Sequence, residues 1–172
     1  MTSIKTLGLV GYPIGLLLLS LAGGRVSKKN LLIGFHGLTT VGFILLLLKQ
    51  SFLLSGIGLF LCITGDTANF YILMTFVTEI VSLDYAPAFA AMISFCCQLG
   101  EFAPVPLYYA FRDYHKVLIY YFLTPIVISM GMLIFFLEDT PICMVAMSSP
   151  EHAFKSLKNI AKHNRIETTL TL

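Results

Sequence analysis

Charge is scarce in this sequence. Only 12% of its 172 residues are Asp, Glu, Lys or Arg, whereas a soluble domain carries about 25% charged residues to cover its surface. Hydrophobic residues make up 57% of the chain and the mean hydropathy is +0.86. These values exclude a separate soluble domain beside the apolar runs, and they predict an integral membrane protein.

Acidic residues are missing from the first 65 positions. Three of the eleven Lys and Arg residues nevertheless lie in one short turn, "SLAGGRVSKKN", between two apolar runs. An acid-free beginning suits import into mitochondria, so we expect a multi-pass protein of the mitochondrial inner membrane. The net charge of +2 says little about partners, because the placement of charge carries the information in a membrane chain. No nucleic-acid partner is expected.

The patterns of catalytic and metal sites are also missing. The four cysteines, Cys62, Cys96, Cys97 and Cys143, form no C-x-x-C pair and have no metal-ligand spacing with the four histidines. There is no Ser/His/Asp order, no glycine-rich phosphate loop and no pair of carboxylates with a plausible site. The sequence therefore predicts no enzyme, no metal and no cofactor.

Long apolar runs are abundant, and five of them approach the roughly 20 residues that cross a bilayer as a helix. They cover residues 7–22, 31–48, 52–81, 85–111 and 117–137. A β-barrel would need alternating strands of about ten residues, which continuous runs such as "FILLLL" do not supply. We expect an all-α membrane protein of about five transmembrane helices, formed by residues 1–147.

Residues 148–172 differ in character from this bundle. Ser149, Pro150 and Glu151 form a helix start signal. Apolar residues then recur at helical spacing, at Ala153, Phe154, Leu157, Ile160 and Ala161. We expect an amphipathic helix at the membrane surface or against the bundle, followed by an extended tail. A solvated helix trailing the last span is the alternative.

The basic residues also predict an orientation. With five spans, seven Lys and Arg residues fall on the side of the basic turn and the tail, and four fall on the other side. The positive-inside rule then places the turn and the C-terminus inside and the N-terminus outside.

Several motifs share one order with a known family. In the turn, Arg25, Lys28 and Lys29 occupy basic positions of a loop signature. Glu79 lies near the end of the third run, and Gly100 precedes a "FRDYHKVL" turn that contains Asp113. Pro125 lies early in the fifth run, and Glu138 lies in "LEDTP" at its end. The segment "EHAFKSLKNIAKHN" follows. Over residues 7–164 the chain resembles the organic cation and anion transporter branch of the major facilitator superfamily.

The resemblance implies helices two to six of the N-terminal half of such a transporter. The family's first helix and second half have no counterpart here, the acid of the loop signature is replaced by Gly24, and an expected Arg falls near Ala86. In the family, charges on the inner side form a network that holds one conformation. Arg25 and Glu79 are expected either to remain as a pair from this network or to face lipid head groups.

Three polar residues within or near the apolar runs are further candidates. Asp66 lies near the middle of the third run, where a charge must pair, find water or be neutralised. It is either a proton or cation site, a buried contact to a neighbouring chain, or a protonated Asp. Glu101 is expected near Arg112 as a structural residue, and His36 as a hydrogen-bonded packing residue.

These observations predict a structural, non-transporting accessory subunit of a larger membrane complex, derived from a solute transporter. Its partners would be the lipid bilayer and other membrane subunits. The alternative is a transporter of organic ions that works as a dimer or with a separate second half, and a small-molecule substrate is left open.

Overall fold

The computed structural model describes residues 2–48, 51–81, 84–137, 140, 145, 151, 154 and 158, without the side chains of 2–5, 7, 101, 114 and 136. Its helices are α1 (Thr2–Ala22), α2 (Lys28–Leu48), α3 (Phe52–Ile80), α4 (Ala86–Phe102), α5 (Pro104–Phe111), α6 (Tyr114–Val117), the π-helix η1 (Leu118–Leu123) and α7 (Thr124–Phe136). The prediction of an all-α fold is confirmed for this part of the chain.

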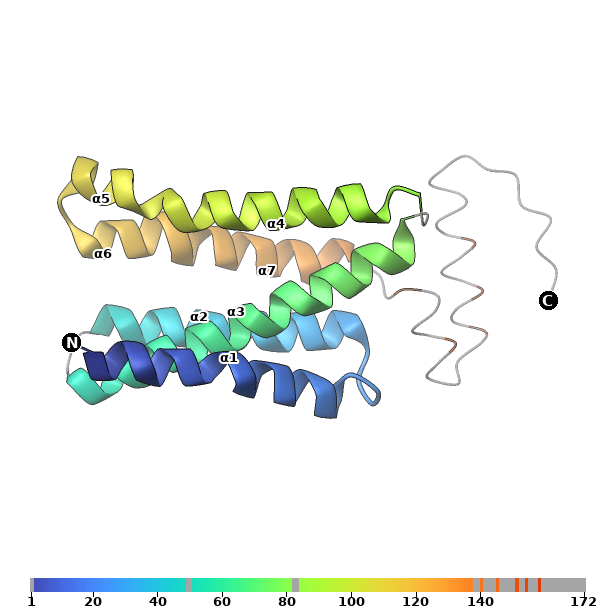
Figure 1. The fold of residues 1–172 in the computed structure, drawn as a ribbon, viewed down its shortest axis with the longest axis horizontal. Coiled ribbons are helices and arrows are strands. Elements are labelled where there is room, and N and C mark those ends of the chain that lie inside the picture. The colour runs from blue at the N-terminus through green and yellow to red at the C-terminus, as the bar shows by residue number, and fades with distance from the viewer. Residues whose placement is uncertain are drawn as a thin grey trace.

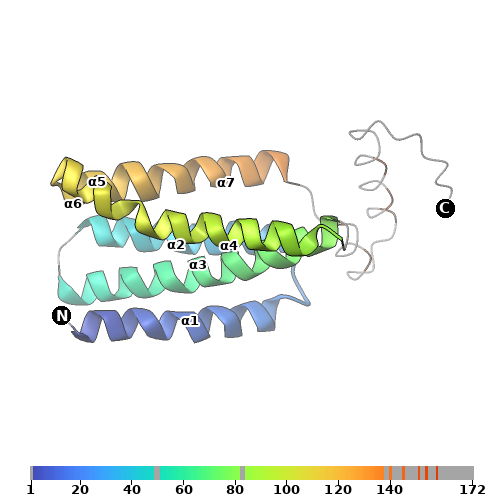
Figure 2. The same cartoon turned by 45° about the horizontal axis from the view of Figure 1, so that its top comes forward.

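The helices run back and forth along one axis (Figures 1 and 2). The N-terminus lies at one end of the bundle, and α7 finishes at the other end, near the start of α2 (Figure 1). Among the described residues, four helical segments are long and apolar enough to cross a membrane: Lys28–Leu48, Phe52–Ile80, Ala86–Phe111 and His115–Phe135. Gly8–Ala22 of α1 is a shorter apolar stretch. The chain is thus a helical membrane protein with four to five candidate spans.

The tightest packing lies where α3 meets α1 and α2, and glycines make it possible. A Cβ placed on Gly15 of α1 would lie 2.5 Å from the Thr64 carbonyl oxygen of α3. On the other side of α3, a Cβ on Gly42 of α2 would lie 2.7 Å from the carbonyl oxygen of Gly58. Lipid offers no hydrophobic drive for helix association, so close backbone approach at small residues supplies much of the attraction.

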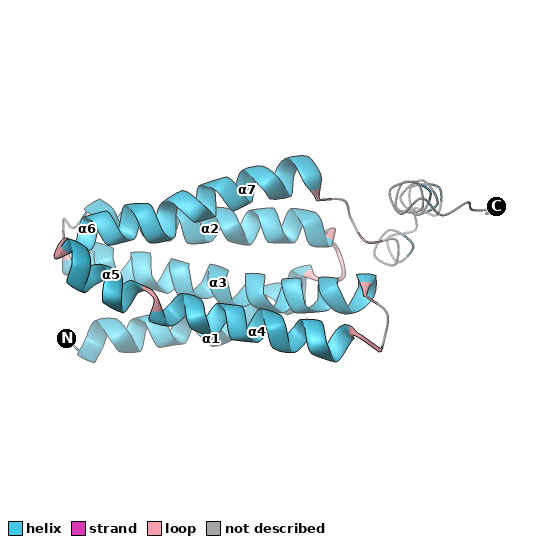
Figure 3. Cartoon of the chain, turned by 90° about the horizontal axis from the view of Figure 1, so that it is seen from above, coloured by secondary structure: helices cyan, strands magenta, loops and turns pink. Residues whose placement is uncertain are grey.

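A core of larger side chains extends this packing towards the end of the bundle that carries the basic turn. Leu31, Leu32 and Phe35 of α2 pack there against Ala68 and Ile72 of α3. In contrast, α4 and α5 bury almost nothing, since Ala86 at the start of α4 is their sole buried residue among the described side chains. Leu133 of α7 also packs against this core, and Figure 3 shows α7 alongside α2.

The expected run 85–111 is interrupted within one candidate span, because α4 ends at Phe102 and α5 begins at Pro104. Pro104 has no N–H to donate to the carbonyl of Gly100. That carbonyl instead accepts a hydrogen bond from the Tyr121 hydroxyl of η1, at 2.8 Å. The side chain of Tyr121 therefore replaces the missing helical bond and ties η1 to α4.

The expected run 117–137 also differs, since its helix begins at Tyr114 and contains the π-turn η1. Pro125 cannot donate to the carbonyl of Tyr121, and its ring crowds that carbonyl. The backbone widens by one residue just before it, so the N–H of Thr124 bonds to the carbonyl of Ile119. The Thr124 hydroxyl donates to the same carbonyl at 2.8 Å.

Candidate functional site

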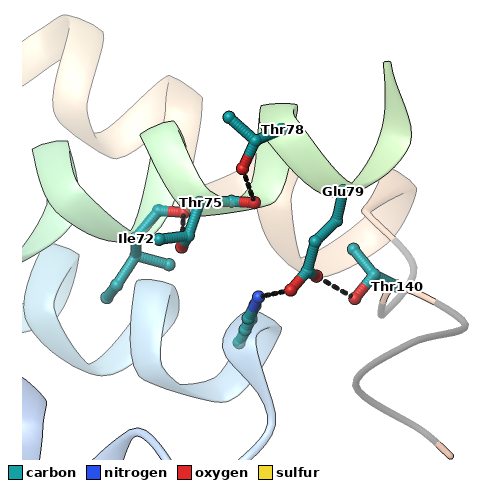
Figure 4. A network of polar contacts seen from close by, with 6 residues as sticks. Ile72, Thr75, Thr78, Glu79 and Thr140 are labelled. Carbon is teal, nitrogen blue, oxygen red and sulfur yellow. Dashed lines mark hydrogen bonds and ion pairs between the residues drawn. The ribbon is translucent and has the colours of Figure 1, made fainter. Parts of the chain in front are cut away.

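The clearest polar cluster joins three segments at the end of the bundle that carries the basic turn (Figure 4). Lys28, the first residue of α2, forms an ion pair with Oε1 of Glu79 near the end of α3. The buried hydroxyl of Thr140, which follows α7 in sequence, donates to Oε2 of Glu79 at 2.7 Å. The side chains of Lys28 and Glu79 are 18% and 23% exposed. The Glu79 carboxylate of α3 thus binds one residue of α2 and one residue that follows α7.

The neighbouring lysine contacts a different helix. Lys29 donates from Nζ to the backbone carbonyl of Ile134 in the last turn of α7, at 3.1 Å. A cation is favourable at that helix end, where carbonyls lack intrahelical partners. Two lysines at the start of α2 oppose its own dipole, so their bonds to α3 and α7 offset an unfavourable position. Ser27 caps this helix start, since its Oγ accepts the N–H of Asn30 at 3.3 Å.

The other residues that match the transporter family do not take part in the cluster around Glu79 in the described part of the chain. Arg25 is exposed in the turn, and Glu79 pairs with Lys28 rather than with Arg25 as one alternative expected. Asp113 lies at the opposite end of the bundle, where Oδ1 accepts the N–H of His115 at 3.0 Å and helps to start α6. Glu138 lies outside the described residues, as does most of the expected amphipathic helix.

His36 joins α2 to α7 within the spans. Its Nε2 lies 3.2 Å from Oγ of Ser129. The Ser129 hydroxyl also donates to the carbonyl of Ile126 at 2.9 Å. Nδ1 of His36 is a buried atom that bonds to no described residue. This contact between α2 and α7 is of the kind expected of a hydrogen-bonded packing residue, and the role of His36 stays a prediction.

Asp66 is described with its side chain, whereas Glu101 is described by its backbone alone. Asp66 is exposed on α3, one turn after the buried Cys62, and its alternative roles stay predictions. Glu101 belongs to α4 by its backbone, and its side chain is outside the described residues. Within the described part of the chain, no three His, Cys, Asp or Glu residues come together in a way that could hold a metal ion.

Two features escaped prediction from sequence. Asn69 of α3 is buried, and its Oδ1 accepts no hydrogen bond from the described residues. Small and polar residues also share one face of α4, at helical spacing, and include Pro87, Ala91 and Gln98. Counting the period of the small residues, rather than of the apolar ones, would have found this stripe.

The fold and the site together define a multi-pass helical membrane protein, with an ion pair that joins two of its helices at one end. No protein-family model matches this chain, and no curated protein matches it. The likeness to the major facilitator superfamily therefore stays a prediction from the residues.

Proposed function

We propose that the protein is a structural, non-transporting subunit of a larger membrane complex, derived from a solute transporter of the major facilitator type. The observation that carries the proposal is the stripe on α4. Pro87, Ala91 and Gln98 are exposed, and Ala90 and Ser94 between them are half-buried. Small residues allow two helices in lipid to approach closely, and polar side chains at the contact bond across it.

Gln98 strengthens this argument because of its depth. It lies near the middle of the candidate span Ala86–Phe111 and is exposed. A primary amide in hydrocarbon loses its bonds to water and gains none from lipid. A helix of a neighbouring chain could approach closely at Ala91 and form hydrogen bonds with the Gln98 amide in the same contact. We therefore expect α4 to be the side that meets another membrane chain.

The test is purification of the tagged protein from its native membrane, followed by measurement of the stoichiometry of the chains that accompany it. Ala91→Phe places a large side chain on the stripe and should release those chains. Ala88→Phe is the matched control, because Ala88 is also exposed on α4 but lies outside the stripe. A complex that survives Ala91→Phe as well as it survives Ala88→Phe contradicts the proposal.

The alternative, transport of organic ions, has its own outcome in the same experiment. A second half of a transporter, or a second copy of this chain, could also occupy the stripe. Purification of the protein as a lone dimer that moves a labelled organic ion into vesicles would favour transport and overturn the structural role. An assembly factor would instead copurify below a whole-number ratio, which also argues against a permanent subunit.

A further inference from the structure

A groove runs between the C-terminal part of α1 and the N-terminal part of α2. It has a volume of about 350 Å³ and is more open than enclosed. Leu18 and Ala22 line it from α1, and Leu31, Gly34 and Leu38 line it from α2. The groove is open at Gly34, because a Cβ placed there would meet no atom within 4 Å.

The groove has one polar end. Asn30 is its polar lining residue, and it lies at the start of α2 beside the basic turn. The N–H of Arg25 donates to the carbonyl of Ala22 at 3.0 Å, which holds the turn against the same end of the groove. From Asn30 to Leu38 the helix rises about 12 Å towards the interior of the span. A polar end and an apolar depth match the two parts of a phospholipid.

The charge at the polar end is positive. The turn carries three cations, of which Lys28 pairs with Glu79 and Lys29 bonds to the carbonyl of Ile134. Arg25 is exposed, and no acidic residue occurs in α1, α2 or the turn to neutralise it. A guanidinium binds a phosphate through two parallel hydrogen bonds. The complementary group is therefore an anionic phosphate at the membrane surface.

We propose that this groove binds one acyl chain of an anionic phospholipid, whose phosphate lies against Arg25 and Asn30. The apolar lining suits an acyl chain, and the exposed Arg25 of the turn beside the polar end suits the phosphate. The site is independent of the proposed subunit role, because it lies on α1 and α2 and not on α4.

The experiment uses the full-length protein in phosphatidylcholine vesicles that contain trace spin-labelled phosphatidylglycerol or spin-labelled phosphatidylcholine. The immobilised fraction of each label measures binding next to the protein. Each basic residue near an anionic surface contributes a preference of about fivefold. Wild type should therefore immobilise phosphatidylglycerol about fivefold more strongly, and Arg25→Gln should abolish that preference. Gly34→Leu should reduce the immobilised fraction of both lipids, because its side chain fills the groove.

Gly131→Leu is the matched control, because Gly131 lies in α7 and a Cβ there also meets no atom within 4 Å. It should leave both immobilised fractions unchanged. Equal immobilisation of the two lipids by wild type, or a preference that survives Arg25→Gln, overturns the proposal. If Gly34→Leu releases a copurifying membrane chain and leaves lipid binding intact, the groove holds a protein segment and the proposal is wrong. Should Gly34→Leu fail to fold, the exposed Arg25→Gln still decides the question.

Discussion

Lys28, not Arg25, neutralises Glu79, although the two cations are only three positions apart. The choice follows from the helices that carry them. Lys28 is the first residue of α2, which packs directly on α3, whereas Arg25 lies in the turn before it. A half-buried ion pair of this kind fixes the start of α2 against the end of α3. Removal of one partner lowers stability mainly because the other charge stays partly buried without a counter-charge.

We expect Lys28→Gln and Glu79→Gln each to lower the free energy of unfolding by about 1.5–3 kcal/mol, as for a hydrogen bond to a charged group. The double variant should lose less than the sum, because both changes remove one interaction. Arg25→Gln is the control and should change stability little. Thermal unfolding in detergent compares the four variants with wild type, and additive losses would show that the pair contributes nothing of its own.

The helices show which parts of the fold a sequence can predict. The expected runs 31–48 and 52–81 agree closely with α2 and α3, since apolar length alone bounds a helix in lipid. The break at Ala103 and the π-turn before Pro125 were not predictable, because prolines are tolerated inside membrane helices wherever another group satisfies the freed carbonyl. Here Tyr121 supplies that group from a different helix.

That replacement bond leads to a test in two steps. Tyr121→Phe should cost about 1–3 kcal/mol, because it leaves the carbonyl of Gly100 without a donor. Pro104→Ala restores an N–H four residues after Gly100, so Tyr121→Phe should cost much less in that background. Unfolding of the four proteins gives the coupling between the two sites. If Tyr121→Phe costs the same in both backgrounds, its hydroxyl does not stand in for the missing bond.

The glycine contacts between α1 and α3 give the sharpest packing prediction. Gly15→Ala places a Cβ 2.5 Å from a backbone oxygen of α3, so the helices must move apart, at a cost of about 1–3 kcal/mol. Gly34→Ala is the control, since its Cβ meets nothing within 4 Å and Ala favours a helix by up to about 1 kcal/mol. The two variants should thus shift the thermal midpoint in opposite directions.

The bundle as a whole combines a closely packed part with a loosely packed one. Glycine contacts bind α1, α2 and α3 together, whereas α4 buries little of its surface. The sequence did not predict this difference, because the runs that form α2 and α4 are both apolar and differ mainly in the period of their small residues. The ion pair was equally hidden, since sequence spacing does not say which of three cations reaches Glu79.

Orientation in the membrane can be tested with single cysteines, in a background whose four native cysteines are replaced by serine. Gly24→Cys lies in the basic turn, and Tyr109→Cys lies in α5 towards the other end of the bundle. A membrane-impermeant reagent should label Gly24→Cys only from the inner side and Tyr109→Cys only from the outer side. Reversed labelling would contradict the charge rule, and labelling of both from one side would contradict the bundle.

The central position of α3 has a consequence for how the protein is made. The glycine faces of α1 and α2 both contact α3, which the ribosome synthesises after them, and membrane helices insert before they associate. During synthesis, α1 must therefore wait in the lipid with Gly8, Gly11 and Gly15 uncovered until its neighbour arrives. A nascent chain halted before Phe52 would carry two inserted helices that lack their common partner, and quality-control proteases should remove it faster than a chain halted after Ile80.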